Sequence, residues 1–189
     1  MNKKKWAGTL AAILFGTLCL AQDADLMSKM INKETNGSWF FQPDKPKAKY
    51  FAVPDLPGGY AFRMKARKGV NPWDVQANSP VAGAINEGDV IMLMYYARAE
   101  QAAEGGSKLT ARIQLNAPPW SPVLETTAAI DGEWKSYCAF RVATASIREK
   151  KSTVSIHLAT AEQIIDLGPV MVFNFGKGYD QAKLSFCSG

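Results

Sequence analysis

The chain has 189 residues and a formal net charge of +5, and Lys3, Lys4 and Lys5 supply three of those five charges. This length fits one domain with a substantial core better than two. Once the three leading lysines are set aside, the remaining charge is too small to form the basic stripe that nucleic-acid binding normally requires, so we expect no nucleic-acid partner.

The N-terminus has the pattern of a secretory signal peptide. The three lysines precede an apolar stretch from Trp6 to Leu20 that ends at the small residue Ala21. The stretch is shorter than the roughly 20 residues of a membrane-spanning helix. A lipoprotein signal would need a small residue before Cys19, where Leu18 stands. We therefore predict cleavage after Ala21, a periplasmic or secreted location, and no membrane contact after cleavage.

The remaining chain divides into a short segment, residues 22–38, and one domain, residues 39–189. The segment from Asp23 to Lys33 predicts a short helix with Leu26, Met30 and Ile31 on one side. After Trp39, short apolar or alternating runs are broken by Gly, Pro and Asn-Pro turns. This spacing is typical of an all-β fold, an antiparallel two-sheet β-sandwich of the jelly-roll kind.

Two segments alternate clearly between apolar and polar residues, which places one side of a strand in the core and the other in water. In the segment 109–116 the apolar positions are Ala111, Ile113 and Leu115, and the polar positions are Thr110, Arg112, Gln114 and Asn116. In the segment 154–159 the inward positions are Val154, Ile156 and Leu158, with Ser155 and His157 outward. A third strand, residues 91–98, is apolar except that Tyr96 and Arg98 share one face.

Two tryptophans stand in turn-rich, polar surroundings where no core stripe would place them. Trp73 follows Asn71-Pro72 and precedes Asp74, and Trp120 follows Pro118-Pro119. An exposed indole offers a flat apolar surface for stacking. The alternative is that each ring folds back as a plug over the sandwich edge. Trp134 opens a strand, and we expect it in the core.

The two cysteines beyond the predicted leader are Cys138 and Cys187. Two cysteines in an oxidising compartment pair readily, although each also suits a small buried thiol on a strand. We predict, as a hypothesis, that they form a disulfide.

The catalytic motifs of common enzyme classes are missing from the sequence. His157 is the only histidine, and no Gly-x-Ser-x-Gly, Cys-x-x-Cys or His-Glu-x-x-His pattern occurs. Paired carboxylates for glycoside hydrolysis are defined by their separation in space, and the sequence offers four acidic candidates, Glu125, Glu133, Glu162 and Asp166. Because two of the four follow loops or turns and suit solvated positions, we predict a protein that is not an enzyme.

The segments around these residues resemble the carbohydrate-binding modules of families 4, 9 and 22, the CenC-like jelly rolls. The resemblance covers residues 60–176 and rests on four pieces in the family's order. The pieces are Asn71-Pro72-Trp73-Asp74-Val75-Gln76, the Gly88-Asp89 strand that ends in Ala97-Arg98-Ala99, Trp134-Lys135-Ser136-Tyr137, and the run from Gln163 to Val170.

The resemblance implies that the polar sides of central strands line a cleft or concave sheet that binds a polysaccharide or oligosaccharide. Trp73 would be the main stacking platform, and the other expected sugar-binding residues are Gln76, Tyr96, Arg98, Gln114, Asn116, Trp120 and His157. An ion pair with a neighbouring carboxylate is the alternative role for Arg98.

The resemblance also implies a metal. Members of the family often hold a structural calcium, for which Asp166 is the single candidate ligand here, whereas a calcium ion takes 6–8 oxygens. No other cofactor is expected. Two further hypotheses stay open beside sugar binding: a glycan-active hydrolase on the same jelly roll, and an adhesive or structural sandwich of the cell envelope.

Overall fold

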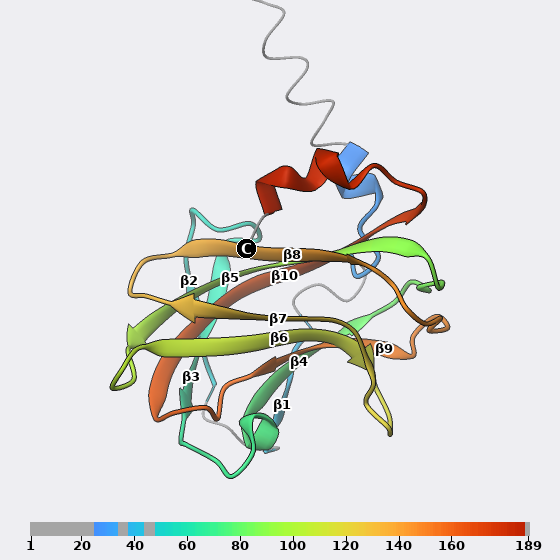
Figure 1. Cartoon of the computed structure of the whole chain (residues 1–189). Helices are drawn as coiled ribbons and strands as arrows, with labels where there is room; N and C mark the ends of the chain where they lie inside the picture. The colour runs from blue at the N-terminus through green and yellow to red at the C-terminus, as the bar shows by residue number, and fades with distance from the viewer. Residues whose placement is uncertain (1–24, 34–37, 44–47, 188–189) are drawn as a thin grey trace, which may run out of the picture.

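The protein folds into two antiparallel five-stranded sheets that pack face to face (Figure 1). The computed structural model describes residues 25–33, 38–43 and 48–187, so the predicted signal peptide and Cys19 lie outside the described residues. Sheet A has the order β2 (Lys49–Ala52), β3 (Tyr60–Ala66), β10 (Gln163–Lys177), β5 (Asp89–Gln101), β8 (Lys135–Val142). Sheet B has the order β1 (Phe40–Gln42), β4 (Gln76–Val81), β9 (Ser152–His157), β6 (Ser107–Leu115), β7 (Pro122–Ile130). The predicted β-sandwich is confirmed.

The main core lies between the two sheets and is built from the apolar positions of the alternating strands. Ala111 and Ile113 of β6 are fully buried, as are Val154 and Ile156 of β9. Leu93 of β5 meets them from sheet A. The period-2 pattern therefore predicted the inner side of these strands correctly.

The segment expected to be a helix forms only one helical turn, at residues 25–28, and then extends along sheet A. Met30 forms an antiparallel bridge with Phe173, and the Ile31 N–H donates to the Val172 carbonyl at 2.8 Å. The side chain of Asn32, fully buried, accepts from the Val172 N–H at 2.8 Å and donates to the Val170 carbonyl at 3.0 Å. The pairing with β10 outweighs the helical periodicity. As a result, residues before the expected domain boundary at residue 39 form hydrogen bonds with a strand of the domain.

A second apolar cluster covers the outer side of sheet A. Met92 of β5 and Phe173 of β10 are buried there under Met30 from the N-terminal segment and Leu184 from the 3₁₀ helix η2 (Gln181–Cys187). This helix and the N-terminal turn lie together over the sheet in Figure 1.

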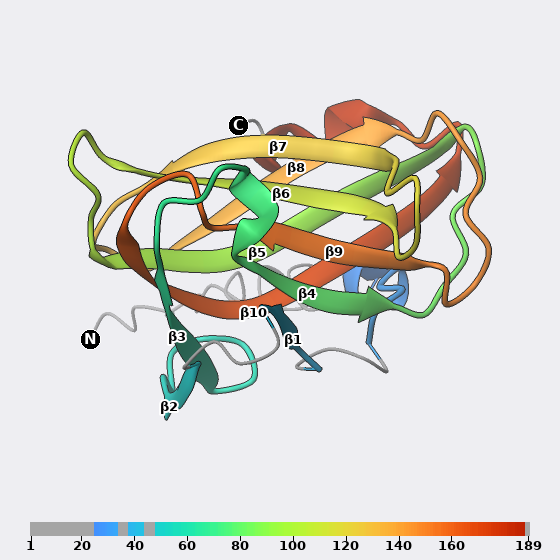
Figure 2. The same ribbon diagram turned by 90° about the horizontal axis from the view of Figure 1, so that it is seen from below.

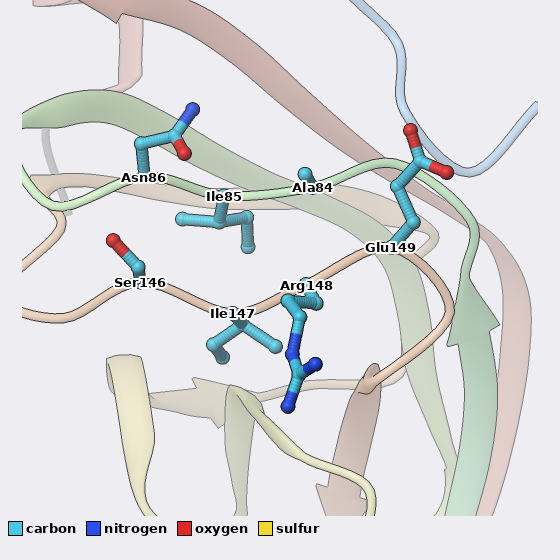
Figure 3. Close-up of a pocket in the computed structure, with 7 residues that line it drawn as sticks. All are labelled: Ala84, Ile85, Asn86, Ser146, Ile147, Arg148 and Glu149. Atoms are coloured by element: carbon cyan, nitrogen blue, oxygen red, sulfur yellow. The ribbon is translucent and has the colours of Figure 1, made fainter.

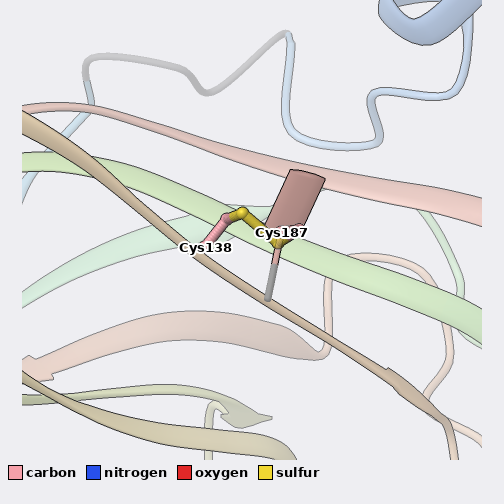
Figure 4. Close-up of a disulfide and its surroundings, with 2 residues drawn as sticks. All are labelled: Cys138 and Cys187. Carbon is pink, nitrogen blue, oxygen red and sulfur yellow. A yellow bond between two sulfur atoms is a disulfide. The ribbon is translucent and has the colours of Figure 1, made fainter. Parts of the chain in front are cut away.

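A disulfide fixes η2 to sheet A. Cys187 at the end of η2 bonds to Cys138 of β8, with 5.3 Å between the two Cα atoms (Figure 4). The predicted pairing is confirmed, and it ties residues 49 positions apart in the chain.

Trp134 corrects the sequence prediction. It precedes β8, is only partly buried, and lies with its ring 5.3 Å from the guanidinium carbon of Arg98. The strand begins one residue later, so the indole stacks under a cation at the sheet surface and does not enter the core.

The helical segments that the structure describes are all too short to cross a membrane.

Candidate functional site

The outward side of sheet B carries a continuous set of polar side chains, which we call the polar face. Hydrogen-bonded neighbours across β4, β9, β6 and β7 place them in rows, with His157 between Gln76 and Thr110, and Ser155 between Asn78 and Arg112. The face comprises Gln76, Asn78, Thr110, Arg112, Gln114, Glu125, Thr127, Thr153, Ser155 and His157. Figure 2 views the sandwich from the side of this sheet.

The centre of the polar face is almost inaccessible although it points away from the core. Ser155 is 0% exposed and Thr153 and His157 are each 3% exposed. The Ser155 hydroxyl donates to Gln76 Oε1 at 2.6 Å, and Gln76 Nε2 donates to Gln42 Oε1 at 2.7 Å. These bonds link β9, β4 and β1 side to side, so the floor is a preformed hydrogen-bonded layer.

Trp73 stands at one end of the polar face on the short 3₁₀ helix η1 (Pro72–Asp74). The turn is closed by Asp74, whose carboxylate accepts from the Asn71 N–H at 3.0 Å and from Asn71 Nδ2 at 3.3 Å. These bonds, the backbone one first, lower the pKa of the Asp74 carboxyl. A Cβ on Gly69 would lie 2.7 Å from the Asp74 carboxylate, so this close approach requires glycine. The result is a tightly bonded loop that leaves the indole 48% exposed.

His157 supports Trp73 from below. The two rings meet edge to face with 6.1 Å between their centroids. Burial, and then the positive charge of Arg112, lower the pKa of His157 to about 4, so the imidazole is neutral at physiological pH. Because the imidazole is nearly inaccessible, the geometry favours a positioning role for His157 over direct contact with a ligand.

Trp120 stands at the opposite end, in the loop between β6 and β7. It adopts a φ of +58°, a conformation that bulky residues rarely take, and its N–H donates to the Ala117 carbonyl at 3.0 Å. Asn116 Nδ2 donates to the Lys150 carbonyl at 3.0 Å and so fixes this loop to its neighbour. The indole of Trp120 is 47% exposed.

Between the two tryptophans the strands present amides, hydroxyls and one ion pair. Gln114 and His157 stand four residues apart along the paired strands β6 and β9, which corresponds to about 13 Å at roughly 3.3 Å per residue. Arg112 Nε lies 2.8 Å from Glu125 Oε2. Gln114 is 6% exposed, and its Oε1 has no hydrogen-bond partner among the described residues.

Thr110, Arg112 and Ser155 belong to this face although they were absent from the expected site. The alternation of segments 109–116 and 154–159 had already placed them on the same side as Gln114 and His157. That signal was sufficient to find them.

Two expected site residues lie on the opposite side of the sandwich. Tyr96 packs, partly buried, against the apolar cluster on the outer side of sheet A. Arg98 is on the same strand and side, and its Nε lies 2.9 Å from Asp166 Oδ2. The single site expected from the sequence is thus divided between two sheets, and the ion pair that was the alternative for Arg98 is present.

Asp166 forms the centre of an ion cluster on sheet A. It is 0% exposed, and its carboxylate also accepts from Arg63 at 2.7 and 2.9 Å. Glu100 contacts the same two guanidinium groups at 2.8 and 3.2 Å. Both oxygens of Asp166 already accept hydrogen bonds from guanidinium groups, so this geometry disfavours Asp166 as a calcium ligand. No group of three or more potential metal-ligating side chains occurs within the described part of the chain.

The four carboxylates considered for hydrolysis are dispersed. Glu125 pairs with Arg112 on sheet B, whereas Asp166 is enclosed on sheet A. Glu162 lies 4.0 Å from Lys65, and Glu133 is exposed in the turn before β8. Three of the four are thus paired with basic side chains.

Two pockets lie outside the centre of the polar face, and the second shares only Thr127 with that face. One, of about 460 Å³, is lined by residues 84–86 and 146–149 of two adjacent loops (Figure 3). The other, of about 440 Å³, lies between the edge strands β7 and β8 beside the disulfide.

Comparison with known proteins identifies the fold. No protein-family model and no curated protein matches the chain. Among solved structures, a family 4 carbohydrate-binding module superposes with a TM-score of 0.53 at 17% identity over 72% of this chain and 86% of that one. The CBM22-1 xylan-binding domain of Xyn10C from Paenibacillus barcinonensis gives 0.52 at 10% identity, over 77% and 91%.

A larger protein contains the same architecture as a part. The arabinose-bound α-L-arabinofuranosidase MgGH51 gives a TM-score of 0.55 at 14% identity over 79% of this chain but only 26% of that one. At these identities the likeness concerns the fold, and the predicted jelly-roll resemblance to carbohydrate-binding modules is confirmed at that level.

Proposed function

We propose that this protein is an exported, non-catalytic carbohydrate-binding module that holds a glycan on the polar face of sheet B. The observation that carries the proposal is the pair of half-exposed tryptophans, Trp73 and Trp120, at opposite ends of a preformed polar layer. The fold supports it, because solved structures that share this fold include a family 4 module and a xylan-binding domain.

Recognition would combine stacking with hydrogen bonds. A pyranose ring packs its C–H surface on an indole, and its hydroxyls take bonds from amides and hydroxyls that are already oriented. Gln76, Thr110 and Arg112 are the partly accessible groups between the tryptophans, and Asn116 borders Trp120. Because the hydrogen bonds from Ser155 to Gln76 and from Gln76 to Gln42 exist before binding, binding would order few further side chains and lose little conformational entropy.

The disulfide supports the export part of the proposal. Structural disulfides persist in secreted and periplasmic proteins and are rare in the cytosol. The Cys138–Cys187 bond closes over an apolar cluster, as expected for a structural bridge.

The test is affinity electrophoresis on a panel of soluble polysaccharides, followed by calorimetric titration of the best ligand. Trp73→Ala should raise Kd at least about tenfold, since a truncated aromatic anchor costs roughly 2 kcal/mol. The fold should survive, because Asp74 and Asn71 close the loop without the indole. Trp134→Ala is the matched control: it removes a tryptophan from the other sheet and should leave Kd unchanged.

The outcomes separate the three hypotheses. Retardation without new reducing ends, together with the loss in Trp73→Ala, supports a binding module. New reducing ends would indicate a hydrolase. Indifference to every polysaccharide would favour an adhesive or structural protein and would overturn the proposal.

A further inference from the structure

The polar face carries basic side chains along its whole length. On β6 the outward positions are Lys108, Thr110, Arg112 and Gln114, so Lys108 lies beyond the row that contains His157, at the Trp73 end. Lys151 precedes β9 and falls on the same side as Thr153 by alternation, at the Trp120 end.

The two lysines at the ends are not neutralised. Both are exposed, and neither has a carboxylate within 4 Å among the described residues. Two carboxylates on this side are already engaged, since Glu125 pairs with Arg112 and Asp74 closes the η1 turn. Glu104 and Glu149 are exposed in the loops before β6 and β9 and are the remaining acidic side chains there.

Flanking loops add net positive charge at both ends, because their basic side chains outnumber Glu104 and Glu149. Arg67 and Lys68 precede the η1 turn, and Arg148 and Lys150 precede β9. All four are exposed, and none forms an ion pair among the described residues. In Figure 3 the guanidinium of Arg148 and the carboxylate of the adjacent Glu149 point in opposite directions.

The outer side of sheet A provides an internal comparison. There Arg63 and Arg98 are matched by Asp166 and Glu100, so the guanidinium charges are cancelled within a few ångströms. On sheet B Arg112 is matched by Glu125 alone, and its positive charge still contributes, after burial, to lowering the pKa of His157.

From this distribution we infer, resting on the proposed function, that the glycan held on the polar face is anionic and carries uronate carboxylates or sulfate esters. Lys108 and Lys151 contact the charged groups near the two tryptophans, and Trp73 and Trp120 stack on the rings. Surfaces of one sign attract the opposite charge over a Debye length, so the association is salt-dependent.

The test uses polymers that differ only in charge. Titrations compare polygalacturonate with its carboxyl-reduced form, and dextran sulfate with dextran, at about 0.02 M and about 0.2 M NaCl. The anionic member of at least one pair should bind about tenfold more tightly at low salt, and the difference should shrink at high salt. Which pair responds distinguishes uronate from sulfate.

Variants place the effect on the polar face. The double substitution Lys108→Met with Lys151→Met should weaken binding of the anionic polymer about fivefold at low salt and leave the neutral polymer unaffected. Lys49→Met with Lys177→Met, two exposed lysines of sheet A, is the matched control and should change neither.

Three other results would each contradict part of the proposal. Equal, salt-insensitive binding of charged and neutral polymers would overturn the anionic specificity while leaving the sugar-binding function intact. Binding of duplex DNA as tight as that of the anionic glycan would overturn it as unspecific charge attraction. Retention of no polysaccharide at all would refute the sugar-binding function itself.

Discussion

The two outer faces of the sandwich are built from the same kind of alternating strands and yet end in opposite states. Sheet A is covered by a second apolar cluster, locked by the Cys138–Cys187 bond, and its arginines are paired around Asp166. Sheet B carries a polar layer whose centre is buried, whose Gln76, Thr110 and Arg112 are partly accessible, and which has exposed tryptophans at both ends. The covered face contributes stability and the polar face is available to a ligand, so changes to each should have separable effects.

The largest effect on stability is expected from releasing η2, which holds Leu184 over the outer side of sheet A. Substituting both cysteines, Cys138→Ser with Cys187→Ser, should lower the free energy of unfolding by about 4 kcal/mol in the chain-entropy model for a loop of this length. Urea titration measures it. Binding of a hydrophobic dye should rise, because η2 no longer holds Leu184 over the sheet, whereas glycan affinity should persist. Unchanged stability in the double variant would show that the apolar contacts alone hold the cover.

The polar face contributes a pH dependence of stability. The folded-state pKa of His157 is about 4, whereas an unfolded histidine titrates near 6.5. The unfolded chain therefore binds a proton as the pH falls below 6.5 and the folded chain does not until about 4. The contribution of His157 to the free energy of unfolding is fully present above pH 6.5, and about 3 kcal/mol of it is lost as the pH falls to 4.

Denaturation at several pH values measures this slope, and the chain offers a clean assignment because His157 is its only histidine. Asp74 and Asp131 have lowered pKa values, so their stabilisation is lost only below the ordinary carboxyl value of 3.8. His157→Gln should flatten the profile between pH 4 and 6.5. A slope that persists in this variant would refute the burial of a neutral histidine.

The ion cluster of sheet A predicts a smaller loss. Asp166→Asn keeps the shape and removes the charge shared by Arg63 and Arg98. Breaking a fully buried pair costs roughly 3–5 kcal/mol, but these arginine side chains are 34% and 27% exposed, so water compensates partly and we expect about 2 kcal/mol. Glu162→Gln, which breaks an exposed pair with Lys65, should cost less than about 0.5 kcal/mol. Equal losses from the two variants would contradict the structural role of Asp166.

The sequence predicted the inner and outer sides of individual strands but not the sheet to which each strand belongs. Alternation assigned Arg98 and Gln114 correctly to outer positions. It could not place them on opposite faces, because β5 and β6 are consecutive in the chain and yet belong to different sheets. Predicting a site that is built from several strands therefore requires knowing which strands pair with one another, and this pairing depends on long-range contacts.

Short sequence motifs predicted the structure correctly where neighbouring residues determine the backbone conformation. They predicted it wrongly where pairing with a distant strand determines it. The Asn71-Pro72 turn exposed Trp73 as expected. In contrast, Met30 and Ile31 pair with β10 although their sequence pattern predicts a helix. Trp134, expected in a strand, lies one residue before β8 begins. Arg112 was missed as a site residue for a different reason: the alternation had placed it on the outer side of its strand, but the resemblance carried no role over to it.

The smallest predicted effect asks whether the polar layer is a support or a contact surface. Gln76 accepts from Ser155 and donates to Gln42, so Gln76→Ala removes both bonds and should cost about 1 kcal/mol of stability. Gln42→Ala breaks only the bond to β1 and serves as the matched control. If Gln76 also bonds the glycan, its variant should weaken affinity about threefold beyond the control, because one neutral hydrogen bond contributes roughly 0.5–1.5 kcal/mol. Equal affinities of the two variants, measured by titration alongside thermal melts, would assign Gln76 to the support of β9 alone and leave recognition to the tryptophans and the residues of β6.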